Sequence, residues 1–293
     1  MTIDYISDVH FDTHLGLWSH VQREHFERNF EAVFVPIFET KSSDTLIVAG
    51  DIGEHNRQNI EALRLIREWI GYRHIVLVMG NHDWFLANRA AIDDYNERSA
   101  NRVNEFKELV AKEEGLYLLD GDVVEIEGIR IGGAMSWYDG SYCFHNLNPY
   151  YTKDREYLQR VWCELNPDGD HIFGIEAFDD LLPGELAKLE RVYMESDVIV
   201  THINPSIRPE HTAKRWSQED TTGFFTFDGS RFLVDTPAQF WIFGHTHIPL
   251  EYQRHGVQCR SNPLGYPNER WKDFRVKHIE IECPRAHSKR NWP

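Results

Sequence analysis

Five short, largely apolar segments recur along the chain, and each is soon followed by a residue that can bind a metal ion. The segments span residues 3–7, 45–50, 74–80, 197–201 and 240–243. Apolar runs of this length are typical of β-strands that are covered on both faces. Because stretches with helical spacing of apolar residues lie between several of them, the sequence predicts an α/β fold.

The remaining segments complete the expected architecture. Helices are predicted over residues 19–39, with Ser19 as the N-cap, over 56–70 and 88–113, and over 174–194 with an interruption at residues 183–184. Further strands are predicted within residues 116–133, with turns at 120–121 and 127–128, and over 250–262 and 274–282.

No internal repeat or low-complexity linker divides the 293 residues. A chain of this length can form one large α/β domain. We therefore predict a single domain over residues 1–284. Within it, residues 136–173 form an aromatic-rich insert that could cap a site, and residues 285–293 are expected to be a disordered tail.

The net charge of the chain indicates which classes of binding partner are disfavoured. The sequence has 47 acidic and 31 basic side chains, a net charge of −16. This disfavours long nucleic acids and anionic membranes, which both attract basic surfaces. The four cysteines form no C-x-x-C pair, which predicts buried free thiols in a reducing compartment. With no signal-peptide pattern and no apolar run near the roughly 18 residues of a membrane helix, we expect a cytoplasmic protein.

The residues that follow the five apolar segments have oxygen and imidazole side chains. In chain order they are Asp8 and His10, Asp51, Asn81 and His82, His202, and His245 with His247. Because the loops at the carboxyl ends of sheet strands lie together, we expect these groups to converge. Oxygen and imidazole ligands suit Mn²⁺, Fe or Zn²⁺, whereas the imidazoles argue against Ca²⁺.

These residues form an ordered set of motifs. They are D-x-H at 8–10, G-D at 50–51, G-N-H-D at 80–83, a lone histidine at 202 and G-H-x-H at 244–247. The set resembles the calcineurin-like metallophosphoesterase superfamily, and the resemblance extends from residue 4 to about 265. It implies a two-sheet β-sandwich flanked by helices.

By this resemblance, the site holds two divalent transition-metal ions, with Mn²⁺ preferred over Fe, Zn²⁺ or Ni²⁺. One ion is assigned to Asp8, His10, Asp51 and His247, and the other to Asp51, Asn81, His202 and His245. Asp51 would bridge the two. Two ions about 3.5–4 Å apart lower the pKa of a bridging water and hold a phosphoryl group for in-line attack.

The resemblance also implies a catalytic role for His82, which would protonate the leaving-group oxygen. Asp83 is its predicted partner, able to orient or charge the imidazole. Protein Ser/Thr phosphatases have GDYVDRG and G-N-H-E, where this chain has GDIGEH and G-N-H-D. The chain is therefore not expected in that branch.

Two segments are candidates for substrate binding. The aromatic insert could stack a base or aryl group on Trp137 or Tyr138, or it could form a small satellite core. The loop over residues 204–216 contains Arg208, which could bind phosphate or could be a solvent-exposed residue.

We expect a metal-dependent phosphoesterase that hydrolyses a small phosphate mono- or diester, such as a nucleotide, by attack of a metal-bridging hydroxide. One alternative is a nuclease of the same superfamily, which a basic groove would favour. The other is a non-catalytic scaffold, but such proteins tend to lose ligands and this chain retains all of them.

Overall fold

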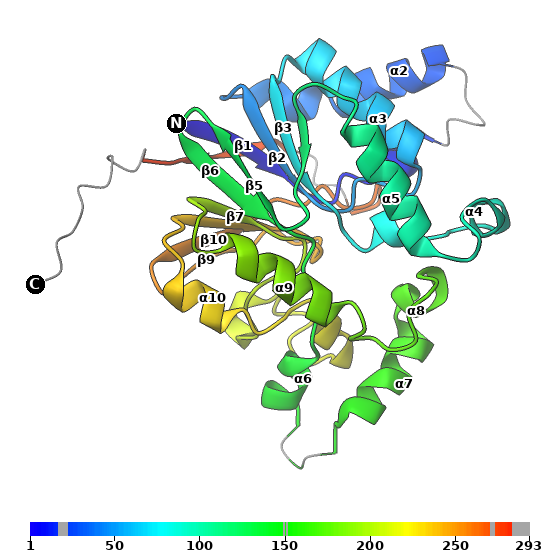
Figure 1. Cartoon of the computed structure of the whole chain (residues 1–293), viewed down its shortest axis with the longest axis vertical. Coiled ribbons are helices and arrows are strands. Elements are labelled where there is room, and N and C mark those ends of the chain that lie inside the picture. The colour runs from blue at the N-terminus through cyan, green and yellow to red at the C-terminus, as the bar shows by residue number, and fades with distance from the viewer. Residues whose placement is uncertain (17–22, 149, 151, 270–272, 283–293) are drawn as a thin grey trace, which may run out of the picture.

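Two β-sheets packed against each other form the centre of the molecule, which a computed structural model describes except for residues 17–22, 149, 151, 270–272 and 283–293 (Figure 1). Helices lie on the outer faces, so the predicted two-sheet α/β fold is confirmed. The expected N-cap at Ser19 and the expected tail over 285–293 both lie outside the described residues.

Both sheets are mixed, with one antiparallel edge strand in the first sheet and antiparallel strands at both edges of the second. In spatial order, the first contains β11 (Lys277–Glu280), β1 (Thr2–Ile6), β2 (Thr45–Ala49), β3 (His74–Val78) and β4 (Leu116–Leu118). The second contains β5 (Asp122–Ile126), β6 (Ile129–Gly133), β7 (Val198–Val200), β8 (Phe240–Phe243), β10 (Val257–Ser261) and β9 (Glu251–Arg254). The runs β1-β2-β3-β4 and β6-β7-β8-β10 are parallel, so within each run the carboxyl ends share one edge.

The helices fall into three groups (Figure 1). The first sheet is covered by α2 (Arg23–Val33), α3 (Asn56–Leu65) and α5 (Ser99–Val110), and the second by α9 (Leu182–Val192) and α10 (Ser230–Asp235). The aromatic insert supplies α6 (Ser141–Asn146), α7 (Arg155–Leu165) and α8 (Pro167–His171) at the lower end of the view. The shorter elements are α1 (Phe11–Leu15), α4 (Arg89–Asp94), η2 (Pro36–Thr40), η3 (Ile66–Ile70), η4 (His82–Trp84), η5 (Pro209–His211) and η6 (Asp220–Phe224).

The central strands are apolar because both of their faces are buried. In β2, Ile47 and Ala49 belong to the cluster between the two sheets, whereas Leu46 and Val48 pack in the cluster beneath the helices. Burying each large aliphatic side chain contributes about 1.5–3 kcal/mol. The strands are therefore held from both sides, and the loops that follow them start from fixed positions.

Two local predictions had different outcomes. The helix expected over residues 88–113 is divided into α4 and α5, because Asn96 and Glu97 have φ of 54° and 55°. A right-handed helix cannot continue through left-handed residues. The turn predicted at 127–128 is confirmed: Glu127 and Gly128 have φ of 51° and 80°, and they join β5 to β6 as a two-residue hairpin.

A charged cluster links the turn before β5 to helices on both sheets. The Asp120 carboxylate lies 2.6 Å from Nζ of Lys107 in α5 and 2.6 Å from Nζ of Lys188 in α9. Burial raises the pKa of Asp120, but the two ammonium groups outweigh it and hold the pKa below its usual value. The ionised form of Asp120 is thus part of the folded structure.

Two further features concern the chain as a whole. No helix within the described ranges is long and apolar enough to cross a membrane. The three cysteines in those ranges are free thiols; Cys143 and Cys259 are buried, as predicted, whereas Cys163 is exposed.

Candidate metal centre

The seven side chains predicted as metal ligands converge at the carboxyl ends of β1, β2, β3, β7 and β8. The ligating atoms form two groups, each within 4.8 Å: Asp8, His10, Asp51 and His247 in one, and Asp51, His202 and His245 in the other. Asn81 joins the second group, since its Oδ1 lies 3.0 Å from Nε2 of His202. The structure therefore brings together both predicted ligand sets, with Asp51 common to the two.

Five of these seven residues have a left-handed backbone. Their φ values are 52° for Asp8, 37° for His10, 51° for Asp51, 69° for His245 and 49° for His247. This conformation costs of order 1–3 kcal/mol at a residue other than glycine, and it concentrates at functional sites. The two packed sheets hold the ligands in a geometry that the isolated chain disfavours.

The glycines of two motifs allow the backbone to approach the carboxylates. A Cβ on Gly80 would lie 2.2 Å from Oδ1 of Asp51, and a Cβ on Gly244 would lie 2.8 Å from Oδ2 of Asp8. Side-chain atoms cannot pack at such distances. The glycines in G-N-H and G-H-x-H are therefore required by close approach to the ligands.

A hydrogen bond on the outer side of the His202 ring orients its metal-binding atom. Nδ1 donates to the carbonyl oxygen of Ala49 at 3.0 Å, which leaves Nε2 as the ring atom for a metal ion. This Nε2 faces Oδ1 of Asn81 at 3.0 Å and Oδ1 of Asp51 at 3.3 Å. Acceptor atoms this close repel one another unless a proton or a cation lies between them.

His245 and His247 are oriented in the same manner. Nε2 of His245 donates to the carbonyl of Phe224 at 3.0 Å, which leaves Nδ1 for a metal ion. Nδ1 of His247 contacts the Glu269 carboxylate at 2.7 Å, and its Nε2 lies 3.1 Å from Nε2 of His10. A carboxylate behind a ligating histidine fixes the ring and increases its basicity.

The titration behaviour of the cluster fits cation binding. Burial lowers the pKa of His245 to about 3 and lowers that of His10, so both are neutral imidazoles, as metal ligands must be. Burial also opposes the charging of His202, but Asp51 outweighs it and raises the pKa to about 9. Oδ2 of Asp8 is buried with no hydrogen-bond partner among the described residues. The cluster therefore attracts positive charge and contains an acceptor that a cation would satisfy.

Asn81 is held by a buried chain of hydrogen bonds from the aromatic insert. Its Nδ2 donates to Oδ1 of Asp168 at 2.8 Å, so its own Oδ1 faces the metal centre. The other carboxylate oxygen of Asp168 accepts from the Tyr138 hydroxyl at 2.8 Å, and that hydroxyl accepts from Nε1 of Trp162 at 2.7 Å. The aromatic insert thus fixes the orientation of Asn81, a predicted metal ligand.

His82 lies between a carboxylate and a phenol at the edge of the ligand cluster. Its Nδ1 is 3.1 Å from Oε1 of Glu54, and its Nε2 is 3.0 Å from the hydroxyl of Tyr266. Burial lowers the pKa of His82, but Asp51 and Glu54 outweigh it and raise the pKa to about 9. The ring is therefore fixed in orientation and basic.

The contact predicted for Asp83 is made by Glu54 instead. The Asp83 carboxylate is buried and accepts backbone N–H groups of Ile52 and Gly53, both at 3.2 Å, and of Gly80 at 2.7 Å. It joins the loops after β2 and β3. The prediction that Asp83 orients His82 is therefore corrected, because these backbone donors hold its side chain. Glu54 belongs to the GDIGEH loop after β2. This position was the one sequence feature that could have identified it as the partner of His82.

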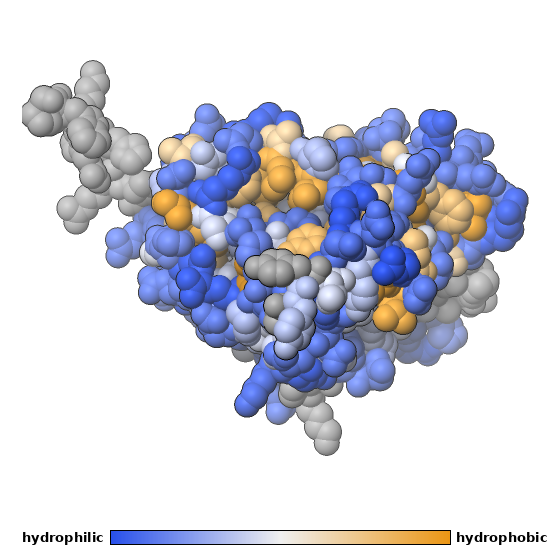
Figure 2. Space-filling model, turned by 90° about the horizontal axis from the view of Figure 1, so that it is seen from below, coloured by the Kyte–Doolittle hydropathy of each residue, from blue (hydrophilic) through white to orange (hydrophobic). Residues whose placement is uncertain are grey.

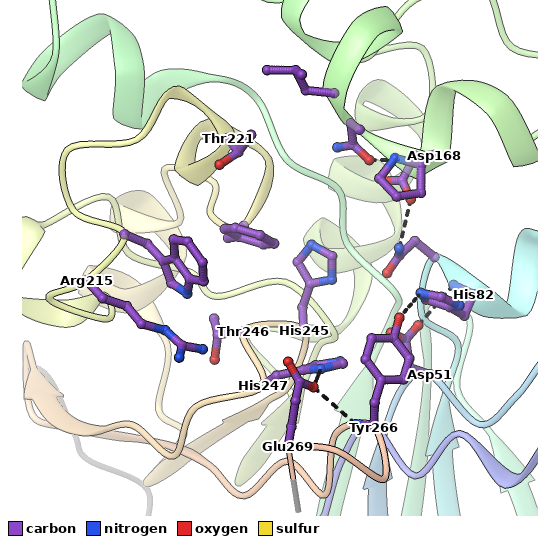
Figure 3. Close-up of a pocket in the computed structure, with 16 residues that line it drawn as sticks. Asp51, His82, Asp168, Arg215, Thr221, His245, Thr246, His247, Tyr266 and Glu269 are labelled. Atoms are coloured by element: carbon purple, nitrogen blue, oxygen red, sulfur yellow. Dashed lines mark hydrogen bonds and ion pairs between the residues drawn. The ribbon is translucent and has the colours of Figure 1, made fainter. Parts of the chain in front are cut away.

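A cavity of about 300 Å³ opens beside the ligands (Figure 3). Asp51, Asn81, His82, His245 and His247 line its inner end. The other walls come from residues 165–168, 215–225 and 266–269. Figure 3 shows Arg215 and Thr221 on the side of the cavity opposite His82 and Asp168.

Trp137 and Tyr138 cannot stack on a substrate, because both side chains are fully buried. Nε1 of Trp137 donates to a backbone carbonyl, that of Phe178, at 2.6 Å, and Tyr138 belongs to the chain of hydrogen bonds behind Asn81. The stacking prediction is corrected. The alternative of a small satellite core is not met either, because both residues belong to the large hydrophobic core that includes residues of the first sheet.

Arg208 also lies outside the lining of the cavity. It is exposed and pairs with Glu210 at 3.2 Å. Two later residues of the same loop, Arg215 and Trp216, line the cavity instead. Position in the sequence indicated the loop but not the residues within it that face the site.

Comparison with known proteins assigns the chain to a family. The family model for calcineurin-like phosphoesterases matches residues 1–249. The chain belongs to this family. The resemblance indicated by the motifs is thereby confirmed. Calcineurin-like phosphoesterases are metal-dependent, and the Asp/His cluster of this member could bind metal ions.

Two relatives extend the comparison. An uncharacterised protein of Acanthamoeba polyphaga mimivirus is 24% identical over 248 residues, which are 81% of this chain and 84% of the relative. The crystal structure of a phosphopantetheinyl hydrolase from Mycobacterium tuberculosis has a TM-score of 0.62 at 19% identity, and the match covers 98% of each chain. At that identity the likeness concerns the fold.

Proposed function

We propose that this family member hydrolyses a small phosphate mono- or diester with two divalent transition-metal ions, Mn²⁺ being the first candidate. The observation that carries the proposal is the convergence of both ligand sets beside a cavity of about 300 Å³. Five left-handed ligand residues support it, because a purely structural cluster has no need of such strain.

The chain's own residues have distinct roles in this proposal. Asp8, His10 and His247 would hold one ion, Asn81, His202 and His245 the other, and Asp51 both. When bound, two such ions lower the pKa of a water molecule and neutralise charge on the phosphoryl group. Because Asp51 lies in both groups, it would keep the two positions adjacent.

His82 would donate a proton to the oxygen of the leaving group. Glu54 fixes the ring through Nδ1, so Nε2 is the atom that faces Tyr266 at the cavity. A general acid must come within about 2.6–3.2 Å of the oxygen it protonates. A substrate that reaches Nε2 would replace the Tyr266 hydroxyl as its hydrogen-bond partner.

The size and charge of the molecule support a small substrate. The cavity is at the lower end of the range for ligand pockets, about 300–1,000 Å³. The net charge of −16 repels a long polyanion, whereas the metal centre would still attract one phosphate group. We therefore propose that nucleotides and other small esters are better substrates than duplex DNA.

A substrate screen tests the proposed function. Protein loaded with Mn²⁺ is assayed against mononucleotides, cyclic nucleotides, aryl phosphates and duplex DNA, with excess chelator as the negative control. A phosphopantetheinyl ester belongs in the screen because the solved relative is a phosphopantetheinyl hydrolase. Metal-dependent hydrolysis of a small ester is the expected result. Failure on every ester would refute the proposal, and faster cleavage of DNA would favour a nuclease.

A further inference from the structure

An apolar wall borders the cavity beside the predicted metal ligands. Leu165 is 66% exposed and Trp216 is 37% exposed, and both line the cavity together with Pro167 and Phe225. We call these four residues the apolar wall. The ring of Phe225 lies 5.1 Å from that of His245, so the wall reaches the ligand cluster.

Within the described residues, the other exposed large apolar side chains come from four separate segments, namely Trp69, Tyr150, Met194 and Val234. The face seen in Figure 2 is mainly hydrophilic, with apolar residues in small separate groups. Single exposed apolar residues are common on protein surfaces, but several that converge on one cavity indicate a binding site. The wall adjoins the metal centre, so its natural occupant is the organic part of the substrate.

A cationic side chain stands beside this wall. The guanidinium of Arg215 lies 4.7 Å from the centre of the Trp216 ring, and in Figure 3 it points toward Thr246. Arg208 is paired with Glu210, whereas Arg215 has no ion pair within the described part of the chain. Arginine binds phosphate and carboxylate groups through two parallel hydrogen bonds. Glu269, which also lines the cavity, is influenced by the charge of Arg215 but forms its ion pair with His247, so the guanidinium remains available for an anion in the cavity.

We propose that the apolar wall and Arg215 form a substrate subsite for aromatic phosphoesters that carry a second negative group. A planar group such as a nucleobase stacks on Trp216, and the second negative group pairs with Arg215. This proposal rests on the proposed function, because the ester itself must lie at the metal centre.

The chemistry of the cavity selects this class of substrate. Stacking on an aromatic side chain contributes about 1–3 kcal/mol per base. The carboxylates among the predicted ligands repel the second negative group of the substrate. That group is therefore expected to lie against Arg215. A short aliphatic ester has no planar group to stack on Trp216, so its KM should be insensitive to changes at that residue.

Two pairs of variants test the subsite in the metal-loaded protein. Trp216→Ala should raise KM for AMP about 5- to 150-fold, the equivalent of the stacking energy, and leave KM for glycerol phosphate unchanged. Trp69→Ala is the matched control, since Trp69 is 44% exposed and lies outside the cavity lining. Arg215→Gln should raise KM for ADP more than for AMP, and Arg208→Gln, from the same loop, should change neither.

Calorimetric titration with AMP gives a second readout that needs no turnover. Wild type and Trp216→Phe should bind AMP, and Trp216→Ala should bind it more weakly. If no ester is hydrolysed but this order of affinities holds, the proposed function fails and the subsite stands. The subsite is overturned if wild type does not bind AMP, or if Trp216→Ala changes KM for AMP and glycerol phosphate equally or changes neither.

Discussion

Replacement of Asp168 by asparagine should loosen Asn81, a proposed metal ligand that the substitution leaves in place. The buried Asp168 carboxylate accepts two hydrogen bonds, from Nδ2 of Asn81 and from the hydroxyl of Tyr138, both at 2.8 Å. The first bond decides which end of the Asn81 amide faces His202. The two donors bind different oxygens of Asp168, and asparagine replaces one of these oxygens by an NH2 group, so one of the two donors would face another donor.

The expected magnitude follows from this count of donors. One buried donor without an acceptor costs about 1–3 kcal/mol, so Asp168→Asn should lower the free energy of unfolding by that amount. Asp168→Ala leaves both donors unsatisfied and should lower it by about 2–6 kcal/mol, a large part of a typical stability of about 5–15 kcal/mol. Loss of a residue that orients a ligand typically weakens metal binding about 10- to 100-fold. We expect this weakening for the ion assigned to Asn81.

Urea denaturation in excess chelator measures stability without metal, and competition with a chromophoric chelator measures the two metal affinities. Asp170→Asn, at an exposed position of the same helix α8, is the matched control. Tyr138→Phe separates the two effects: it should lower stability and keep both affinities, because the bond from Asn81 to Asp168 remains. Wild-type stability and unchanged affinities in Asp168→Asn would refute the reasoning.

Three further predictions concern other parts of the molecule. Asp51→Asn should lose both ions in metal analysis and abolish hydrolysis while the circular dichroism spectrum is kept; a full metal content would contradict the shared-ligand assignment. His82→Ala should retain its metals and lose more rate on alkyl esters than on p-nitrophenyl esters, whereas an equal loss on both would indicate a positioning role. Asp120 has a pKa held below its usual value, so the stability it contributes is present above its unfolded pKa of about 3.9 and is lost as pH falls through the folded value. Asp120→Asn should therefore lower Tm at neutral pH and make Tm less sensitive to acid below about pH 4; an unchanged acid profile would show that the two lysines do not stabilise it.

The sequence by itself determined the sheets and the gathering of the ligands. Strands such as β2 are apolar on both faces, and a chain can bury such strands only inside packed layers. Parallel strands place their carboxyl ends at one edge, so residues that directly follow them, such as Asp8 and Asp51, must lie close together. These conclusions depend on the local pattern of apolar residues and on the rules of sheet topology, and both hold in the folded structure.

Only the tertiary structure decided which neighbouring side chains face the centre. Asp83 and Glu54 are both acidic residues in loops of the site, yet backbone N–H groups hold Asp83 and leave Glu54 to contact His82. Likewise the aromatic insert buries Tyr138 behind Asn81, while Trp216, from a separate loop, stays exposed at the cavity. The direction of a loop side chain depends on its backbone angles and on contacts with segments far away in the sequence. Those contacts exist only once both sheets and the insert have packed together.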